Sequence, residues 1–311
     1  MIISGIHHVT AIASDPQRNL DFYTGVLGLR LVKLTINFDD PGTYHLYFGN
    51  DEGTPGSILT FFPWPGVPRG TVGNGQVSAT SFAVPPGSLD YWASRMTAHQ
   101  VVTGAVTERF GEPVMSFEDP DGLPLELIAT GHARPGRAWS GGSVDAAQAI
   151  CGFHSATLAE EGYERTASLL VETMGWKLVG EDANRYRYAA GASGSAGAIV
   201  DIVCAPDTRL GRSGGGTVHH IAWRTPDDAQ QKLWRSALVG AGYNVSPVMD
   251  RTYFHSIYYR EPGGVLFEIA TDPPGFAIDE SRDHLGERLM LPDWLESQRA
   301  AVVAALPPLV R

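Results

Sequence analysis

Residues 27–32 read Leu-Gly-Leu-Arg-Leu-Val, and residues 174–179 read Met-Gly-Trp-Lys-Leu-Val. The same offset aligns His-Val-Thr at 8–10 with Ser-Ala-Thr at 155–157. A second repeat places Asp-Pro-Asp-Gly at 119–122 against Glu-Pro-Gly-Gly at 261–264, and each is followed by a strand with a central glutamate. Repeats of this length indicate duplicated structural units. The sequence therefore predicts four modules, of which the first resembles the third and the second resembles the fourth.

Each module has the pattern of a short strand, a helix and several further strands separated by Gly and Pro. In the first module, Asp15 is expected to cap the helix with Pro16 at its first position, and Gly28 is expected to end it. Residues 163–174 are expected to form the same helix in the third module. The predicted fold class is therefore α+β, built from four βαβββ modules.

The predicted domain boundaries follow composition. Residues 1–132 hold modules one and two, and residues 148–275 hold modules three and four. Residues 133–147 are rich in Gly, Arg, Ser and Pro and are expected to form a linker. Residues 276–311 form a C-terminal tail, which is expected to be helical around 291–306.

The composition favours a small-molecule partner. The 311 residues carry a formal charge of −11, which argues against nucleic acid or an anionic membrane as a partner. Cys151 and Cys204 are the two cysteines, too few for a disulfide framework. Neither a signal peptide nor an apolar run of about 20 residues is apparent. We therefore expect a soluble, cytoplasmic protein.

Three short motifs supply a set of candidate metal ligands. They are Gly-Ile-His-His-Val-Thr at 5–10, Val-His-His-Ile-Ala-Trp at 218–223 and Gly-Val-Leu-Phe-Glu-Ile-Ala at 264–270. Two imidazoles and one carboxylate on one face of a metal, with the other positions open, are typical of non-haem Fe(II) oxygenases, and Mn(II) accepts the same ligand types. Glu268 and one histidine of each His-His pair are the candidate ligands. A glutamate in an apolar strand would otherwise be a costly buried charge.

The repeats provide an internal comparison for these ligands. The position of His8 corresponds to Ser155, that of Glu268 to Glu126 and, allowing a gap of two residues, that of His220 to Thr80. One complete set and one dismantled copy are what a single-site enzyme on a duplicated scaffold would show. Because Glu126 also lies in an apolar strand, the glutamate alone is weak evidence for a metal.

The motifs together resemble the vicinal oxygen chelate superfamily, which includes glyoxalases and extradiol dioxygenases. The runs at 37–47 (Asn-Phe-Asp-Asp-Pro-Gly-Thr-Tyr-His-Leu-Tyr), 250–258 and 272–276 resemble hydroquinone-type ring-cleaving dioxygenases, so that the resemblance spans nearly the whole chain. It implies two half-barrel domains, with one ligand from the first module and two from the last. The family motif places the ligand histidine just before a β-branched residue, which implies His8, His220 and Glu268 as the ligands. Modules one and four would then hold the site, and modules two and three an empty counterpart.

This resemblance implies an extradiol-type dioxygenase that uses Fe(II) to insert O2 into a hydroquinone or a catechol-like ring. Tyr258, ten residues before Glu268, would hydrogen-bond the bound phenolate, and Arg251 would face an anionic oxygen. Thr10 is expected to share the face of His8. Arg109 occupies the place of Arg251 in the second module, which leaves a structural role for Arg251 equally open.

The proton shuttle is less well defined. Many extradiol dioxygenases carry an acid-base histidine where this chain has Met249, so His255 is the first candidate, with His45 and His219 in reserve. Strand alternation is expected to send His7 and His219 away from the metal. Four aromatic residues are candidates for shaping the pocket: Tyr44, Tyr47, Phe62 and Trp64.

Two other functions use the same fold. A glyoxalase-like isomerase or lyase with Zn(II) or Ni(II) usually takes a second carboxylate ligand, for which this chain offers Thr60. A non-catalytic binding protein, as in bleomycin resistance, would not need a complete ligand set. A small aromatic diol and O2 are the expected partners, and assembly into a homo-oligomer is left open.

Overall fold

The structure is a computed structural model that describes residues 1–311 except 2, 134–137 and 192–196. Its four modules each run strand, helix and three strands, as the repeats predict. The first comprises β1 Ile6–Ala13, α1 Pro16–Asp21, the π-helical turn η1 Phe22–Val26, β2 Arg30–Asn37, β3 Asp40–Gly49 and β4 Ile58–Pro63. The second comprises β5 Gln76–Val84, α2 Leu89–Ala98, β6 Thr107–Arg109, β7 Glu112–Glu118 and β8 Pro124–Ala129.

The other two modules repeat this order. The third comprises β9 Phe153–Glu160, α3 Glu164–Ser168, the π-helical turn η3 Leu169–Thr173, β10 Lys177–Asp182, β11 Arg185–Ala189 and β12 Ile199–Cys204. The fourth comprises β13 Thr217–Thr225, α4 Asp228–Gly240, β14 Met249–Asp250, β15 Phe254–Arg260 and β16 Leu266–Pro274. The helix predicted at 163–174 is thus present as α3 and η3.

Local sequence explains where the first helix begins and ends. The Asp15 side chain accepts a hydrogen bond from the backbone N–H of Arg18, and Pro16 occupies the first position of α1. Gly28 has a φ of +68°, which is costly for a residue with a Cβ. The predicted cap and stop are therefore confirmed.

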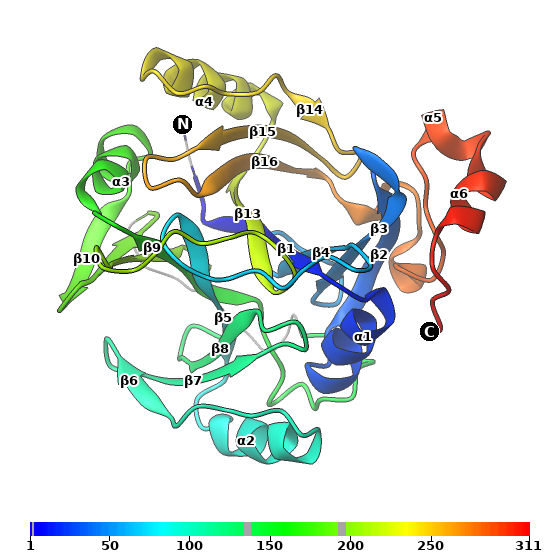
Figure 1. The fold of residues 1–311 in the computed structure, drawn as a ribbon, viewed down its shortest axis with the longest axis horizontal. Helices are drawn as coiled ribbons and strands as arrows, with labels where there is room; N and C mark the ends of the chain where they lie inside the picture. The colour runs from blue at the N-terminus through cyan, green and yellow to red at the C-terminus, as the bar shows by residue number, and fades with distance from the viewer. Residues whose placement is uncertain (2, 134–137, 192–196) are drawn as a thin grey trace.

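Two curved eight-stranded sheets form the molecule (Figure 1). The first has the order β14-β15-β16-β13-β1-β4-β3-β2, so it joins modules four and one through the antiparallel pair β1–β13. The second has the order β10-β11-β12-β9-β5-β8-β7-β6 and joins modules three and two through β5–β9. Each sheet thus takes one module from each half of the chain, and the divisions at 132 and 148 separate halves of the sequence and not the two sheets.

Aromatic side chains pack between the sheets and beneath the helices. Trp92 of α2 and Trp234 of α4 are buried, and α4 covers β15 and β16 in Figure 1. Trp176 of module three meets Trp223 of module four edge to face, with ring centroids 5.0 Å apart. Burying one such ring contributes about 2–3 kcal/mol, so these contacts help to hold the two sheets together.

The C-terminal tail returns to the first sheet beside β2 and β3 (Figure 1). Its elements are the 3-10 turns η4 Phe276–Ile278 and η5 Arg282–His284, then α5 Asp293–Glu296 and α6 Arg299–Ala305. Lys33 of β2 is fully buried, and its Nζ lies 2.5 Å from carboxylate oxygens of both Asp279 and Glu280. The expected helical tail is present, anchored on the sheet by this buried charge cluster.

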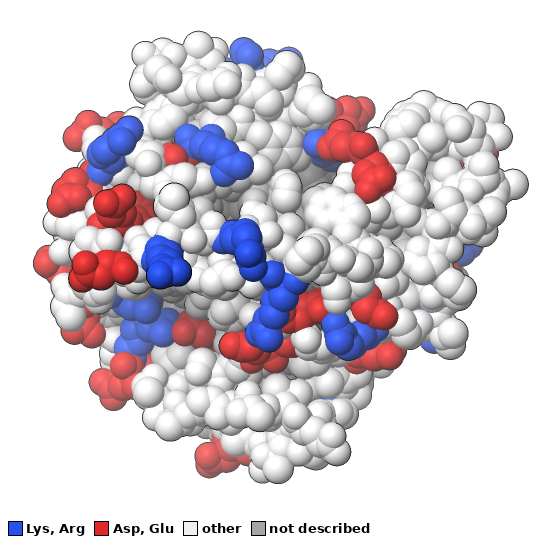
Figure 2. Space-filling model, viewed as in Figure 1, with Lys and Arg blue, Asp and Glu red and all other residues white. Residues whose placement is uncertain are grey.

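Part of the predicted linker, residues 134–137, lies outside the described residues. In the remainder, Val144 is buried and packs at the end of the first helix, where a Cβ added to Gly28 would lie 2.6 Å from Val144 Cγ2. None of the described helices is both long and apolar enough to cross a membrane. Figure 2 shows acidic and basic side chains intermixed on the face drawn there.

Candidate metal centre

Two β-bulges shape the strands that carry the histidines. In the β1–β13 pair, His8 lies opposite Ala222 and Thr10 opposite His220, and the register shifts skip His7 and His219. A bulge adds an unpaired residue and re-aims the neighbouring side chains. Simple alternation therefore does not hold for His219, which borders the same cavity as His220.

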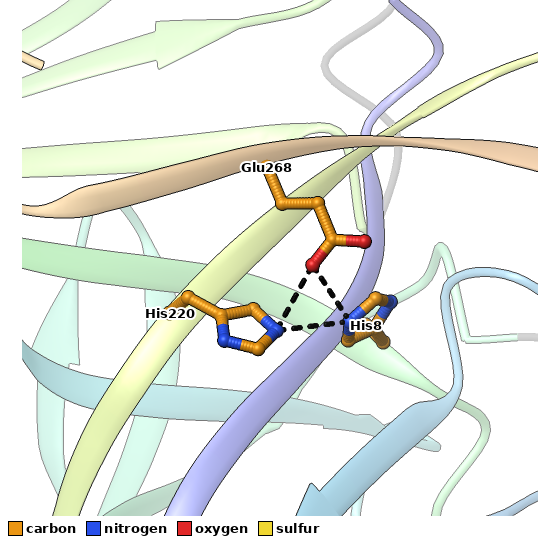
Figure 3. Close-up of side chains that lie close together, drawn as sticks. All are labelled: His8, His220 and Glu268. Carbon is orange, nitrogen blue, oxygen red and sulfur yellow. Dashed lines mark hydrogen bonds and ion pairs between the residues drawn. The ribbon is translucent and has the colours of Figure 1, made fainter. Parts of the chain in front are cut away.

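The three predicted ligands lie together at the centre of the first sheet (Figure 3). Their inward atoms converge: His8 Nε2 and His220 Nε2 are 3.2 Å apart, and Glu268 Oε2 lies 3.3 Å from the first and 3.0 Å from the second. All three side chains are buried. They come from β1, β13 and β16, so modules one and four both contribute.

The outward atoms of the same residues are held by neighbours. His8 Nδ1 lies 2.9 Å from His7 Nδ1, and His220 Nδ1 lies 2.8 Å from His219 Nδ1. Glu268 Oε1 accepts a hydrogen bond from the Ser256 hydroxyl. Partners of this kind orient metal ligands in known sites.

The inward atoms fit a divalent cation. Glu268 Oε2 is buried without a hydrogen-bond partner among the described residues. Burial alone would raise the pKa of Glu268, but the nearby imidazoles of His8 and His220 outweigh it and hold that pKa well below its usual range. Burial lowers the pKa of His220, which favours the neutral imidazole. An ionised carboxylate facing a neutral imidazole is the donor set a metal requires.

A cavity of about 400 Å³ opens above these ligands. Its walls are largely aromatic and include Tyr47, Phe62, Trp64, Phe254 and Tyr258. A cavity of this size and lining suits a small aromatic molecule. Tyr44, also expected to shape the pocket, instead donates its hydroxyl hydrogen bond to the Pro307 carbonyl at 3.0 Å.

Tyr258 and Arg251 lie at the cavity wall as the sequence predicts. Tyr258 pairs with Glu268 across β15 and β16, and its ring meets His220 edge to face at 5.7 Å. Arg251 Nε donates to Tyr258 Oη at 3.2 Å, and Arg251 Nη2 lies 3.0 Å from Asp39 Oδ2. Burial, followed by the Glu268 charge, raises the pKa of Tyr258. The phenol is therefore protonated and held in place by a guanidinium.

Of the other predicted site residues, Thr10 lies beneath the cavity, His45 lines it and His255 lies outside it. Thr10 is fully buried on β1 and accepts a hydrogen bond from the Thr60 hydroxyl at 2.9 Å, beneath the cavity wall. His45 lines the cavity. His255 does not: its Nδ1 lies 2.6 Å from Asp228 Oδ1, and its ring borders a separate hollow beside the tail. Its role as a proton shuttle stays a prediction that this position does not favour.

Sequence reasoning missed two residues that the structure brings to the site. Ser256 donates a hydrogen bond to Glu268. Because it lies two residues before Tyr258, strand alternation predicts that both side chains share one face, and this could have identified it. Asp39 lines the cavity and pairs with Arg251, but it belongs to a turn whose place depends on long-range packing. Both lie in runs that the sequence singled out, 37–47 and 250–258, but neither was assigned a role there.

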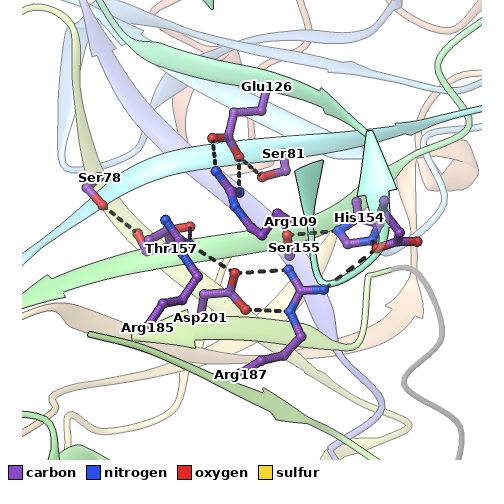
Figure 4. Close-up of polar contacts among 11 residues, drawn as sticks. Ser78, Ser81, Arg109, Glu126, His154, Ser155, Thr157, Arg185, Arg187 and Asp201 are labelled. Atoms are coloured by element: carbon purple, nitrogen blue, oxygen red, sulfur yellow. Dashed lines mark hydrogen bonds and ion pairs between the residues drawn. The ribbon is translucent and has the colours of Figure 1, made fainter. Parts of the chain in front are cut away.

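The second sheet contains the dismantled copy of the site (Figure 4). Arg109 donates two hydrogen bonds of 2.7 Å to Glu126. Its guanidinium therefore stands where a metal ion would stand beside Glu268. Thr157 pairs with Ala79, as Thr10 pairs with His220 in the first sheet. The counterpart of His220 is therefore Ala79 and not Thr80. The gap of two residues allowed in the sequence comparison misplaced the match by one residue, because it did not account for the bulge in β5.

Fold and site define a known class. The sequence model of the Glyoxalase/Bleomycin resistance protein/Dioxygenase superfamily matches residues 5–127 and 152–269. The chain belongs to this superfamily.

Individual relatives resemble nearly the whole chain. It is 50% identical over 304 residues to the Bacillus subtilis protein named "Putative ring-cleaving dioxygenase MhqO", covering 98% of this chain and 96% of that protein. It is 37% identical over 300 residues to the chlorohydroquinone/hydroquinone 1,2-dioxygenase of Sphingobium indicum, covering 94% and 93%. A crystal structure described as a putative dioxygenase from Bacillus subtilis superposes with a TM-score of 0.94 at 49% identity, covering 99% and 98%.

Proposed function

We propose that this protein is a metal-dependent, extradiol-type ring-cleaving dioxygenase that inserts O2 into a hydroquinone or catechol-like ring. The observation that carries the proposal is the convergence of His8, His220 and Glu268 beneath an aromatic cavity, with the buried Glu268 Oε2 facing the Nε2 atoms of both histidines. The names of the relatives support the same reaction, since two of them refer to ring cleavage or to hydroquinone oxygenation. The charge of −11 supports a small aromatic diol as the substrate over a nucleic acid.

Fe(II) is the proposed metal, with Mn(II) as the alternative that the same donors accept. Three protein ligands would leave open positions for the diol and O2, and the bound metal would supply the electron transfer between them. Thr60 stands where a glyoxalase-like enzyme would need a second carboxylate, and its hydroxyl is hydrogen-bonded to Thr10. The ligand set therefore favours the oxygenase over the isomerase.

The chain's own residues bind and orient the ring. Tyr258, whose oxygen accepts from Arg251 Nε, keeps its proton to donate to a substrate phenolate. Arg251, fixed by Asp39, adds a positive charge at the same wall. Phe62 and Phe254 line the cavity and would pack against the ring and keep water from it. Such positioning brings together two reactants that meet slowly in solution.

The test is anaerobic reconstitution with Fe(II), followed by methylhydroquinone or catechol and then oxygen. We expect one O2 consumed per ring and a new ultraviolet-visible band from the ring-opened product. Metal binding without oxygen uptake across these phenols would contradict the proposed reaction and favour an isomerase or a binding protein.

A matched pair of variants locates the working site. His8→Ala should lose both metal binding and turnover, measured by metal content and oxygen uptake. Ser155→Ala, at the corresponding position of the second sheet, should retain both. Equal effects of the two substitutions would show that the triad is not the metal centre.

A further inference from the structure

A chain of hydrogen bonds runs from the cavity wall into the protein across three strands. Tyr47 Oη lies 2.9 Å from His45 Nδ1, His45 Nε2 lies 2.8 Å from Thr60 Oγ1, and the Thr60 hydroxyl donates to Thr10 Oγ1 at 2.9 Å. Tyr47 and His45 share one face of β3, with ring centroids 4.0 Å apart. Thr60 and Thr10 are completely buried. Water therefore cannot replace the inner partners of this chain.

With the Thr60 hydroxyl donating to Thr10, the number of protons fixes the direction of the other hydrogen bonds in the chain. Thr60 has one hydroxyl proton and gives it to Thr10, so its oxygen must accept from His45 Nε2–H. A neutral imidazole carries one N–H, so His45 Nδ1 is an acceptor, and the Tyr47 hydroxyl donates to it. The proton of Tyr47 is thereby used, and its oxygen is left with accepting capacity only.

Electrostatics supports neutral partners throughout. Burial, then the nearby His8 and His220, holds the pKa of His45 well below its usual range. Burial, then the neighbouring Tyr258, raises the pKa of Tyr47 well above its usual range. The imidazole therefore stays neutral and the phenol keeps its proton, as the assigned direction requires.

Tyr47 belongs to the cavity that holds the triad and not to a separate hollow. Its ring packs on Phe276 of the tail and on Tyr253, with centroids 5.1 and 6.1 Å away, which fixes its position. Tyr258, the phenol beside Glu268, borders the same space. The cavity thus presents two phenols with opposite capacities: Tyr258 can donate, and Tyr47 can only accept.

Resting on the proposed function, we propose that Tyr47 recognises the second hydroxyl of the substrate, the one that is not at the metal, by accepting its hydrogen bond. An oxygen that can only accept selects a ring carrying a free O–H. It disfavours a methyl ether, which would place two acceptors against each other. His45 is the positioning residue that fixes this polarity by taking the Tyr47 proton.

The test is anaerobic titration calorimetry on the Fe(II)-loaded protein, where no turnover occurs. The ligands are hydroquinone, 4-methoxyphenol, which keeps the oxygen without its proton, and phenol, which lacks the oxygen. We expect the wild type to bind hydroquinone about three- to tenfold more tightly than either analogue, the range of one net hydrogen bond. In Tyr47→Phe the three affinities should agree within about twofold.

Two further variants separate recognition from general damage. His45→Leu frees the Tyr47 proton, so 4-methoxyphenol should gain affinity relative to hydroquinone. Tyr44→Phe, on the same strand with its hydroxyl on Pro307, should keep the wild-type preference.

The outcomes are distinct from those of the functional test. Unchanged preference for hydroquinone in Tyr47→Phe, or equal binding of all three ligands by the wild type, would overturn the inference alone. Preference without oxygen uptake would support the inference and contradict the proposed reaction. Failure of every phenol to bind the wild type would overturn both.

Discussion

Glu268 and Glu126 occupy equivalent strand positions and are both buried, yet their surroundings differ. Arg109 neutralises Glu126 with two hydrogen bonds, whereas Glu268 Oε2 faces two imidazole nitrogens. A buried carboxylate needs a cation, and among the described residues no Arg or Lys pairs with Glu268. The comparison within one chain is therefore the residue-scale reason to place a metal beside Glu268.

Replacing Arg109 tests this account of the second sheet. Arg109→Met should leave Glu126 buried without its cation and lower the free energy of unfolding by about 3 kcal/mol. The double variant Arg109→Met/Glu126→Leu should recover most of that loss. Urea unfolding of the wild type, Arg109→Met, Glu126→Leu and the double variant measures both terms. A single variant as stable as the wild type would show that Ser81 and water suffice for Glu126.

A buried pair of carboxyl groups, Glu160 and Glu261, makes the stability of the fold depend on pH. Glu160 of β9 is fully buried, and neither of its oxygens has a hydrogen-bond partner among the described residues. Burial, then the charge of Glu261, raises the pKa of Glu160 from 4.5 to about 8. Its contribution is fully present below about pH 4.5, where both states are protonated, and is lost as the pH rises to about 8.

Glu160→Gln should remove this loss. The difference in free energy of unfolding between the variant and the wild type should grow by on the order of 2–4 kcal/mol as the pH rises from about 5 to about 8. Above about pH 8 this difference should stay constant. Chemical unfolding at a series of pH values measures the difference. A difference that does not change with pH would mean that Glu160 is ionised in the fold.

At the scale of elements, bulges and helix ends decide where side chains point. Register shifts skip His7 and His219 in the first sheet, and the β5–β9 pair has shifts at corresponding places. The two sheets therefore share their bulges even though only one keeps its ligands. This supports the view that the bulges belong to the fold and were used by the site.

The ends of the two π-helical turns provide a matched pair. Gly28 and Gly175 have φ values of +68° and +73°, but a Cβ on Gly28 would meet Val144 at 2.6 Å, whereas nothing lies within 4 Å of one on Gly175. Gly175→Ala should cost about 1 kcal/mol from the backbone alone, and Gly28→Ala about 2–3 kcal/mol because Val144 must also move. Thermal unfolding of both variants provides the comparison. Equal losses would show that Val144 does not pack against this turn.

At the scale of the whole molecule, the candidate metal joins the first and the last module. Its ligands lie on β1 of the first module and on β13 and β16 of the last. A ligand that binds only the folded state stabilises it, by about 2.7 kcal/mol at 100 times its dissociation constant. The metal should therefore strengthen the first sheet without being required for the fold.

Removal of the metal tests this directly. Chelation should lower the Tm by several degrees while preserving the far-ultraviolet circular dichroism, and Fe(II) or Mn(II) should restore it. His8→Ala should have the Tm of the chelated protein and show no response to either ion. An equal response in that variant would place the stabilising ion elsewhere.

The sequence by itself determined the four modules, the bounds of the helices in the first and third modules and the three candidate ligands, because these depend on repeats, caps and residue types that are local in the chain. Only the tertiary structure decided which modules share a sheet and that Ala79, not Thr80, matches His220. It also placed His255 outside the cavity and aligned Tyr47, His45, Thr60 and Thr10. These features depend on bulges and on the register between strands from distant parts of the chain, which are set by packing of the whole fold and not by neighbours in sequence.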